Sequence, residues 1–491
     1  MAESFKLTRL PSLKTAADFR AYVAELGVEI PCDDNPDVAA LGESLEEVKV
    51  NGKIVGNRFA IHPMEGWDGT ATGGPTDEVR RRWKRFGESG AKLIYGGEAM
   101  AVRPEGRANP NQLIITKNNL GGLAELRELL VAAHREKFGN AEDLVVGFQL
   151  THSGRFCRPI DKARFEPQVA YRHPILDARF QVTRDDQVLT DDQVADLVGD
   201  FVRAARVARD AGADFVDIKH CHGYLLHEFL GAHTRPGRYG GSIENRTRIL
   251  REIVAGIRSD GNNIDLGVRV SAFDLVPHRA DPEQSKSGKL GPGVPEEFVL
   301  PYPFQFGIDH EDPTSINLSE TFQFIELCAE LGVKLLNISG GSPYYNPHCQ
   351  RPAAYPPSDG YQPAHDPLID VARLLGVARQ LRTRLPTGMK LVGTGYSYLQ
   401  EFLPHVAGAA VREGWADMAG LGRMVLSYPH LPADILGGEI LEKHLICRTF
   451  SDCTTAPRNG LVSGCFPLDR HYKNLPQAEE LKTVKKQGRS S

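Results

Sequence analysis

The sequence has no apolar run long enough to cross a membrane and no excess of positive charge. No stretch approaches the ~20 consecutive apolar residues of a membrane-spanning helix. The opening residues, MAESFKLTRL, also lack the apolar core of a secretion signal. The formal net charge is −5, which argues against nucleic acid or an anionic membrane as a partner. We therefore expect a cytoplasmic protein that binds neither nucleic acid nor a membrane.

Cysteine is scarce as well. Eight cysteines occur in 491 residues, and they are scattered except for Cys447, Cys453 and Cys465 near the end. In a large chain without a secretion signal, we expect reduced thiols or metal ligands and not a disulfide framework. Hydrophobic residues, in contrast, make up 41% of the chain and can form a large core. The length suggests two or three domains, although one α/β barrel can absorb most of it.

The stretch 214–250 concentrates titratable side chains between a predicted strand and a predicted helix. Residues 214–219 alternate polar and apolar, as a strand with two different faces does. Its end is crowded with Lys219, His220, His222 and Tyr224. A Gly- and Arg-rich loop follows, and a helix begins at Ser242. A surface turn with incidental histidines is the alternative; the density of polar groups favours one unit of a βα barrel with its chemistry at the strand's carboxyl end.

The same strand-then-helix order recurs along the chain. Strands are predicted at 58–62, 93–96, 144–149, 215–219, 266–270, 335–338, 390–393 and 417–421. Helices are predicted between them, for example at 191–210, 319–330 and 366–384, with a short last helix near 432–436. Eight such units predict a parallel sheet that closes on itself, so the predicted fold is α/β, a (β/α)8 TIM barrel.

Three segments lie outside this pattern, and we assign 51–440 to the barrel. Residues 1–50 are predicted to be an N-terminal extension whose helix is capped by Thr15, ends at Gly27 and packs against the barrel. Residues 276–317 form a long insertion after the fifth strand, expected to be a lid or a subunit contact on the active face. A second loop, 342–363, follows the sixth strand on that face. Residues 441–491 are a cysteine-containing tail.

Two runs near His222 resemble the Old Yellow Enzyme family of FMN-dependent oxidoreductases. They are His222-Gly-Tyr-Leu-Leu-His-Glu-Phe-Leu230 and Arg238-Tyr-Gly-Gly-Ser-Ile-Glu-Asn-Arg246. The resemblance extends from about Asn57 to Pro432 and is nearest to the barrel domain of the 2,4-dienoyl-CoA reductase and trimethylamine dehydrogenase types. It implies an enzyme with FMN as cofactor, NAD(P)H as reductant and a small-molecule substrate. A homo-oligomer is left open. No GxGxxG motif opens a βαβ unit, so we expect no separate dinucleotide-binding domain.

The resemblance also implies where the flavin ring lies. Pro63 and Met64 are expected under the isoalloxazine, while Ala99, next to Glu98, and Gln149 meet its polar edge. Glutamine suits this position because its amide offers both a donor and an acceptor. Arg269 is expected to stabilise negative charge on the reduced ring. The alternative for Arg269 is a buried ion pair.

The loops after the last three strands are expected to bind the phosphate. They contribute Gly341, Gly395, Gly422 and Arg423. TIM barrels commonly bind phosphate with glycine amides and a helix N-terminus at the ends of strands seven and eight. We expect no metal ligand among the site residues.

The catalytic residues expected from the resemblance are Lys219, His222 and Tyr224. The family holds a substrate carbonyl with a His/His or His/Asn pair at i and i+3, and a tyrosine two residues later donates a proton. Lys219 at the first position departs from that pattern. Glu65, where some relatives carry cysteine, is expected to face Lys219, although Lys219 paired with Asp217 or Glu98 is an alternative. Strand alternation turns the neighbouring His220 to the opposite face, and two residues of the third loop, His152 and Arg155, are expected to be structural.

These residues favour reduction of an activated C=C bond by hydride from NAD(P)H, an ene-reductase activity. The alternative on the same barrel is an amine dehydrogenase or N-demethylase, for which Tyr344, Tyr345 and Tyr355 would form an aromatic bowl around a cation. A non-catalytic flavin-binding protein is the third hypothesis.

The tail resembles a degenerate iron–sulfur motif. Its cysteines are spaced C-x5-C-x11-C, and Phe450 stands where the second of four ligands would be. A [4Fe–4S] cluster is normally held by four thiolates, and the larger relatives continue into nucleotide-binding domains beyond this point. We therefore predict no iron–sulfur cluster, with the three thiols packed as small buried hydrophobes and Phe450 filling the cluster volume. A three-iron cluster or a distant fourth ligand are the alternatives.

Overall fold

A closed barrel of eight parallel strands forms the centre of the computed structural model, which describes residues 7–286 and 289–487. The strands are β3 (Phe59–Ile61), β4 (Leu93–Ile94), β6 (Val145–Thr151), β7 (Phe215–His220), β8 (Asp265–Ser271), β11 (Val333–Ser339), β12 (Lys390–Gly393) and β13 (Met418–Leu421). Pairing of β4 with both β3 and β6 closes the ring. The short β5 (Ala99–Ala101) adds further pairing to β6. The predicted (β/α)8 barrel is confirmed.

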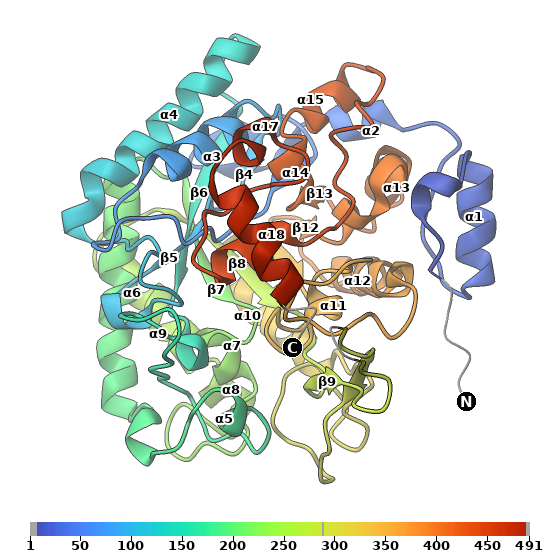
Figure 1. The fold of residues 1–491 in the computed structure, drawn as a ribbon. Coiled ribbons are helices and arrows are strands. Elements are labelled where there is room, and N and C mark those ends of the chain that lie inside the picture. Colours follow the sequence, from blue (N-terminus) through green and yellow to red (C-terminus); the bar gives the residue numbers. More distant parts are fainter. Residues whose placement is uncertain (1–6, 287–288, 488–491) are drawn as a thin grey trace.

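Helices surround the barrel (Figure 1). The longer ones are α3 (Asp77–Gly87), α4 (Leu120–Phe138), α6 (Asp191–Asp210), α9 (Arg248–Ser259), α10 (Ser319–Glu330), α12 (Pro367–Arg382) and α13 (Leu403–Arg412). Short ones are α2 (Val38–Gly42), α5 (Leu176–Arg179), α7 (Leu225–Leu230), α8 (Ile243–Arg246), α11 (Pro347–Gln350), α14 (Met424–Ser427) and α15 (Leu431–Leu436). A capping box formed by Thr190 and Gln193 begins α6 at the predicted residue. Within the described ranges, every helix falls short of the length and apolarity that a membrane crossing requires.

A hairpin covers the amino end of the barrel. It consists of β1 (Leu45–Val50) and β2 (Lys53–Val55). Its apolar side chains join the barrel interior in one buried cluster that includes Tyr95 and Phe215. These two rings meet edge to face at 5.3 Å. Because side chains fill this end, the open polar residues are concentrated at the carboxyl end of the strands.

The N-terminal extension packs on the barrel's outer layer, as predicted. Thr15 forms a capping box with Asp18 at the start of α1 (Ala16–Glu25). Phe19 of this helix stacks on Phe402 with ring centroids 4.6 Å apart. The hydroxyl of Tyr22 donates a 2.6 Å hydrogen bond to a carboxylate oxygen of Asp366.

The insertion after β8 is ordered by aromatic packing, but it does not enter the main cavity. It contains the hairpin of β9 (His278–Ala280) and β10 (Gly293–Pro295). The buried Tyr302 contacts His173, with its hydroxyl 3.2 Å from the imidazole Nε2. None of the described residues of 276–317 lines the cavity at the carboxyl end of the barrel. The residues that line the cavity therefore do not support the predicted lid.

The C-terminal segment lies in front of the carboxyl end of the barrel (Figure 1). It forms α16 (Asp452–Arg458), α17 (Arg470–Lys473) and α18 (Gln477–Gln487) around a small apolar core of its own. Two polar contacts fasten it to α3. Arg81 forms a 2.9 Å ion pair with Asp469, and the buried Arg82 donates to the carbonyl of Ser463 at 3.1 Å. The tail is thus part of the folded domain.

Candidate functional site

One cavity at the carboxyl end of the strands brings the predicted site residues together. It is lined by every predicted residue except Gly341, namely Pro63, Met64, Ala99, Gln149, Lys219, His222, Tyr224, Arg269, Gly395, Gly422 and Arg423. They come from the ends of different strands. Their convergence follows from the parallel barrel, in which all carboxyl ends lie on one face.

Gly341 is the exception. Its amide donates a 2.7 Å hydrogen bond to the carbonyl of Phe273, and its own carbonyl accepts one from the Ser271 hydroxyl at 2.9 Å. The residue therefore joins the loops after β8 and β11. Because its N–H is already used, the expectation that Gly341 offers an amide to phosphate is corrected.

Two side chains of the cavity lining, Gln149 and Arg269, supply an amide and a cation, and the buried carboxyl of Asp217 lies behind the amide. The side-chain nitrogen of Gln149 donates to Asp217, which is fully buried. Burial raises the pKa of Asp217 to about 7, against the lowering effect of that hydrogen bond. The Nε of Arg269 finds no acceptor among the described residues. A buried donor without a partner is rare in a folded protein, so Arg269 fits an electron-rich group of a ligand.

A second arginine, which the sequence analysis missed, lies beside Arg423. Arg423 donates to the carbonyl of Pro352 at 2.7 Å, and Arg351 donates to the Thr454 hydroxyl. The Nη1 of Arg423 and the Nε of Arg351 have no acceptor in the described part of the chain. Burial and then the charge of Arg423 lower the pKa of Arg351 to about 9.

Two adjacent guanidinium groups without a carboxylate are costly to bury, and an anion relieves that cost. The neighbouring Gly395 has φ +96°, a left-handed conformation that favours glycine, and it precedes the 3-10 helix Tyr396–Phe402. These groups fit a phosphate. Arg351 lies in the irregular loop 342–363, where no periodicity indicates which side chain faces inward.

Lys219, Glu65 and Tyr224 form one polar cluster in the upper part of the cavity. A carboxylate oxygen of Glu65 lies 3.4 Å from the Lys219 ammonium and accepts a 2.9 Å hydrogen bond from the Tyr224 hydroxyl. The ammonium also lies 3.6 Å from the centroid of the Tyr224 ring. Burial first, and then the Glu65 charge, raise the pKa of Tyr224 well above its ordinary value. The expected pair of Glu65 and Lys219 is present, whereas Glu98 is 2.9 Å from Arg82 instead.

His222 is held as a neutral imidazole. Its Nε2 lies 3.0 Å from the Ser339 hydroxyl, and its backbone amide donates to the Ser271 hydroxyl at 3.0 Å. Burial, and then the charges of Arg269 and Lys219, lower the pKa of His222 well below its ordinary value. It can therefore form hydrogen bonds to a substrate without carrying charge.

The neighbouring His220 lies on the outside of the strand, as alternation predicts. Its ring packs at 5.3 Å from that of Phe324, and its Nδ1 lies 2.9 Å from the carbonyl of Ile218. It does not line the cavity and cannot replace Lys219 there.

Aromatic side chains complete the upper wall. Trp67 donates a 2.8 Å hydrogen bond to the second oxygen of Glu65. Tyr344 stacks on Phe156 at 3.9 Å, and its hydroxyl lies 3.1 Å from that of Tyr224.

Two members of the expected aromatic bowl lie elsewhere. Tyr345 is buried and donates to Asp274 at 2.7 Å, and Tyr355 is 41% exposed on the surface. Neither ring lines the cavity. Of the three tyrosines named from the sequence, Tyr344 alone is in position.

The C-terminal segment supplies one wall of the cavity, which the sequence analysis did not foresee. Its lining residues are Cys453, Thr454, Pro457, Arg458 and Ser463. The cysteine spacing could not predict this wall, because the spacing does not indicate where the segment packs on the barrel.

The packing expected for the tail cysteines needs correction. Cys447 and Cys465 are buried, but Cys453 is half-buried and faces the cavity. Phe450 does not fill a cluster volume. It is 38% exposed and stacks on Tyr355 at 5.7 Å.

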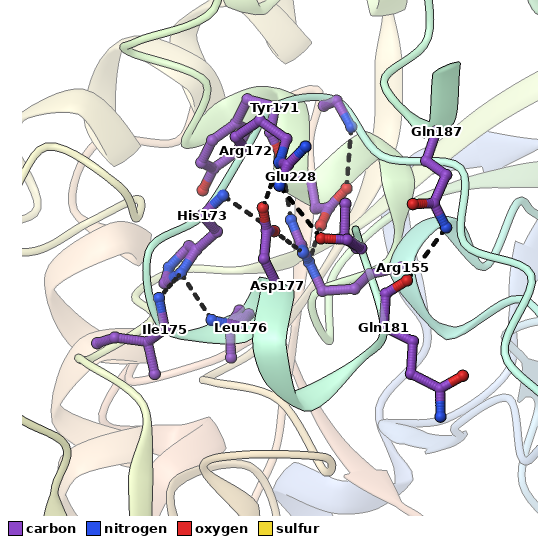
Figure 2. Close-up of polar contacts among 12 residues, drawn as sticks. Arg155, Tyr171, Arg172, His173, Ile175, Leu176, Asp177, Gln181, Gln187 and Glu228 are labelled. Atoms are coloured by element: carbon purple, nitrogen blue, oxygen red, sulfur yellow. Dashed lines mark hydrogen bonds and ion pairs between the residues drawn. The ribbon is translucent and has the colours of Figure 1, made fainter. Parts of the chain in front are cut away.

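Arg155 has the structural role that we expected. It is buried between Asp177 and Glu228, at 2.5 and 2.7 Å (Figure 2). Glu228 belongs to α7, the helix that follows Tyr224. The second oxygen of Glu228 accepts from the amide of Ala170 at 3.1 Å. This network therefore ties the loop after β6 to the loop after β7.

The sequence is similar to that of known flavin oxidoreductases. Residues 46–286 match the NADH:flavin oxidoreductase / NADH oxidase family. NADPH dehydrogenase of Bacillus subtilis (strain 168) is 31% identical over 243 residues, which are 48% of this chain and 63% of that protein. NADPH dehydrogenase of Bacillus velezensis (strain DSM 23117 / BGSC 10A6 / LMG 26770 / FZB42) is 33% identical over 239 residues, with coverages of 48% and 63%. The match thus spans less than two thirds of these relatives.

Solved structures share the fold. The old yellow enzyme homologue from Zymomonas mobilis superimposes with a TM-score of 0.54 and 19% identity, over 82% of this chain and 94% of that one. A complex of 2-naphthoyl-CoA reductase with 2-naphthoyl-CoA superimposes with a TM-score of 0.63 and 18% identity, over 90% of this chain and 58% of that one. Histamine dehydrogenase from Rhizobium sp. 4-9 superimposes with a TM-score of 0.62 and 20% identity, over 88% of this chain and 52% of that one. At these identities the likeness shows the barrel alone. Residues 46–286 are therefore similar to the NADH:flavin oxidoreductase / NADH oxidase family, and the barrel as a whole shares the fold of these solved structures.

Proposed function

We propose that the chain is an FMN-dependent oxidoreductase that uses NAD(P)H to reduce an activated C=C bond, such as that of an enone or enal. The observation that carries this proposal is the shared cavity. Lys219, His222 and Tyr224 line the same space as Gln149, Arg269 and Arg423. One cavity therefore holds the groups that would polarise the substrate, the tyrosine that would donate the proton, and the residues that would contact the flavin.

The cavity offers each kind of contact that FMN needs. Arg269 and Gln149 would hold the polar edge of the ring, and Arg351 with Arg423 would hold the phosphate. Met64, Ala99 and the glycines Gly395 and Gly422 would line the ring and the chain that links it to the phosphate. A bound FMN supplies hydride transfer between NAD(P)H and the alkene.

The chain's own residues would polarise the acceptor and deliver a proton. The neutral His222 and the Lys219 ammonium would bind the electron-withdrawing group and stabilise the negative charge that develops on it. Tyr224 keeps its proton at neutral pH because its pKa is raised. It would donate that proton to the α-carbon as a general acid, and Glu65 holds its hydroxyl in place at 2.9 Å.

Oxidation of an N-methylamine is the second candidate. The carboxylate of Glu65 beside the rings of Trp67 and Tyr344 favours it, since carboxylates and aromatic faces attract cations. The Lys219 ammonium, 3.4 Å from Glu65, argues against it. A non-catalytic flavin-binding role is the third hypothesis, and the cluster of Tyr224 and His222 argues against that one.

The test is the flavin itself. The purified chain should be yellow, release FMN and not FAD, and be bleached by NADH or NADPH without oxygen. A folded chain that neither carries nor takes up FMN would contradict the proposal. We also propose a cytoplasmic location, and a homo-oligomer stays open.

A further inference from the structure

The Lys219 ammonium occupies a position that has the character of a cation-binding site. It lies 3.6 Å from the centroid of the Tyr224 ring and 3.4 Å from a carboxylate oxygen of Glu65. The lysine is 3% exposed, so its charge is withdrawn from bulk water. An aromatic face within about 6 Å and a carboxylate are the two groups that attract an organic cation most strongly.

Glu65 is fixed as an acceptor by its neighbours. The Trp67 indole donates to one oxygen at 2.8 Å, and the Tyr224 hydroxyl donates to the other at 2.9 Å. The Tyr344 ring lies 6.1 Å from that of Tyr224, in a nearly parallel orientation. Trp67 and Tyr224 thus hold the carboxylate, Tyr344 lies against Tyr224, and the Lys219 ammonium lies on the Tyr224 ring.

No other carboxylate competes for this role among the described residues that line the cavity. The remaining cations of the upper cavity have partners outside it. Arg82 pairs with Asp68 at 2.8 Å, and Arg458 pairs with Asp359 at 2.9 Å. Lys219 is therefore the cation that neutralises Glu65 in the substrate region.

We propose that Lys219 is a specificity determinant, a tethered cation that fills an ammonium subsite made by Glu65 and the Tyr224 ring, which Trp67 and Tyr344 hold in place by hydrogen bonds. This inference rests on the proposed function, because it concerns the choice of substrate at the same cavity. The filled subsite excludes amine substrates that carry positive charge. It admits neutral or anionic acceptors, whose developing negative charge the same ammonium stabilises.

The proposal predicts that removing the ammonium creates a site for an organic cation. Lys219→Met removes the charge and keeps most of the apolar stem, while Lys219→Ala removes the stem as well and opens more space. Lys219→Arg keeps the charge and is the matched control. Tetramethylammonium chloride is the probe, and tert-butanol is a neutral probe of similar shape.

Binding is measured on the flavin-loaded protein by two signals, the flavin difference spectrum and the tryptophan fluorescence, to which Trp67 contributes together with Trp83 and Trp415. Sodium chloride balances the ionic strength. In Lys219→Ala or Lys219→Met, tetramethylammonium should bind at least about tenfold more tightly than in the wild type or Lys219→Arg. Affinity for tert-butanol should not rise in parallel. Adding Glu65→Gln to Lys219→Ala should abolish the gain.

Two results would overturn the inference. One is equal binding of tetramethylammonium to the wild type and both charge-removing variants. The other is a gain that survives when Glu65→Gln is added to Lys219→Ala. If the chain binds no flavin at all, the proposed function fails, whereas tryptophan fluorescence still reports whether the ammonium subsite exists.

Discussion

Tyr224 carries the hydroxyl on which the proposed proton transfer depends. Its pKa is raised, so the acid form dominates at neutral pH. Tyr224→Phe removes the proton and leaves the ring that lies against Lys219. We expect oxidation of the reduced protein by an alkene to slow by ~10²–10⁴-fold, because general acid catalysis is typically worth that factor. Reduction by NAD(P)H should be nearly unchanged. Stopped-flow measurement of each half-reaction separates the two, and equal slowing of both would assign Tyr224 another role.

Asp217 gives a pH-dependent prediction. Burial raises its pKa from an ordinary 3.8 to about 7. Between these values the folded chain keeps a proton that the unfolded chain has released, so the contribution of Asp217 to stability falls as pH rises through this window. Asp217→Asn cannot ionise and can still accept from Gln149. Between pH 5 and pH 8, the free energy of unfolding of this variant should therefore rise by about 2–3 kcal/mol relative to that of the wild type.

Thermal melting of the wild type and Asp217→Asn at both pH values checks this prediction. The variant should gain a few degrees in melting temperature relative to the wild type on going from pH 5 to pH 8. A difference between the two proteins that does not change with pH would mean that Asp217 is ionised throughout, or neutral throughout.

At the scale of single residues, the sequence predicted side-chain direction only where a regular element defines it. Strand alternation placed Lys219 inward and His220 outward, and the structure agrees. The sequence left Glu65, Asp217 and Glu98 as possible partners of Lys219. The structure places Glu65 beside the Lys219 ammonium. Arg351 was missed because an irregular loop has no period to define an inward face.

The arginines that line the cavity differ in how firmly they should hold an anion. Arg351 and Arg423 each keep a buried donor without a protein acceptor in the described chain. Arg423→Ala or Arg351→Ala should weaken FMN binding by ~10–150-fold, since a charge-assisted phosphate contact is worth ~1.5–3 kcal/mol. Arg458→Ala is the matched control, because Arg458 lines the same cavity but is paired with Asp359.

Fluorescence titration of the flavin-free variants with FMN and with riboflavin gives the measurement. The loss should appear for FMN and not for riboflavin, which has no phosphate. Stoichiometric flavin in purified Arg423→Ala, or equal losses for both ligands, would remove this pair from the phosphate site.

The tail cysteines give a prediction about metal content. Cys447 and Cys465 are buried and Cys453 faces the cavity, with no fourth cysteine nearby in sequence. We expect anaerobically purified protein to contain essentially no iron or acid-labile sulfide, because a [4Fe–4S] cluster normally needs four thiolates. Iron near three or four atoms per chain, with absorbance beyond the flavin bands, would contradict this expectation.

At the scale of elements, buried runs were the most predictable feature. All eight barrel strands were predicted. β6 and β8 are buried along nearly their whole length and are mainly apolar, whereas β7 shows the alternation of polar and apolar residues. The bounds of α6 and α10 were also predicted, whereas α12 ends two residues before the predicted 384. The hairpin of β9 and β10 and the docking of α16 depend on long-range contacts, so no local pattern indicated them.

The whole molecule is organised by the closed barrel. Its amino end is filled by the β1–β2 cluster, and its carboxyl end is covered by the C-terminal segment, with the cavity between. This arrangement leaves one cavity at the carboxyl face, lined by both apolar and polar side chains, where the proposed cofactor and substrate would bind. The direction of electron flow within that cavity is the central claim of the proposed function.

Anaerobic reoxidation tests that claim most directly. The protein is reduced with one equivalent of NADPH or NADH, and separate samples are mixed with an enone, an enal and an N-methylamine panel while flavin absorbance is followed. The account predicts that an enone or enal restores the oxidised spectrum and yields the saturated product. It also predicts that the N-methylamines do not reduce the oxidised protein. Reduction of the oxidised flavin by an N-methylamine, with no reoxidation by any alkene, would contradict it.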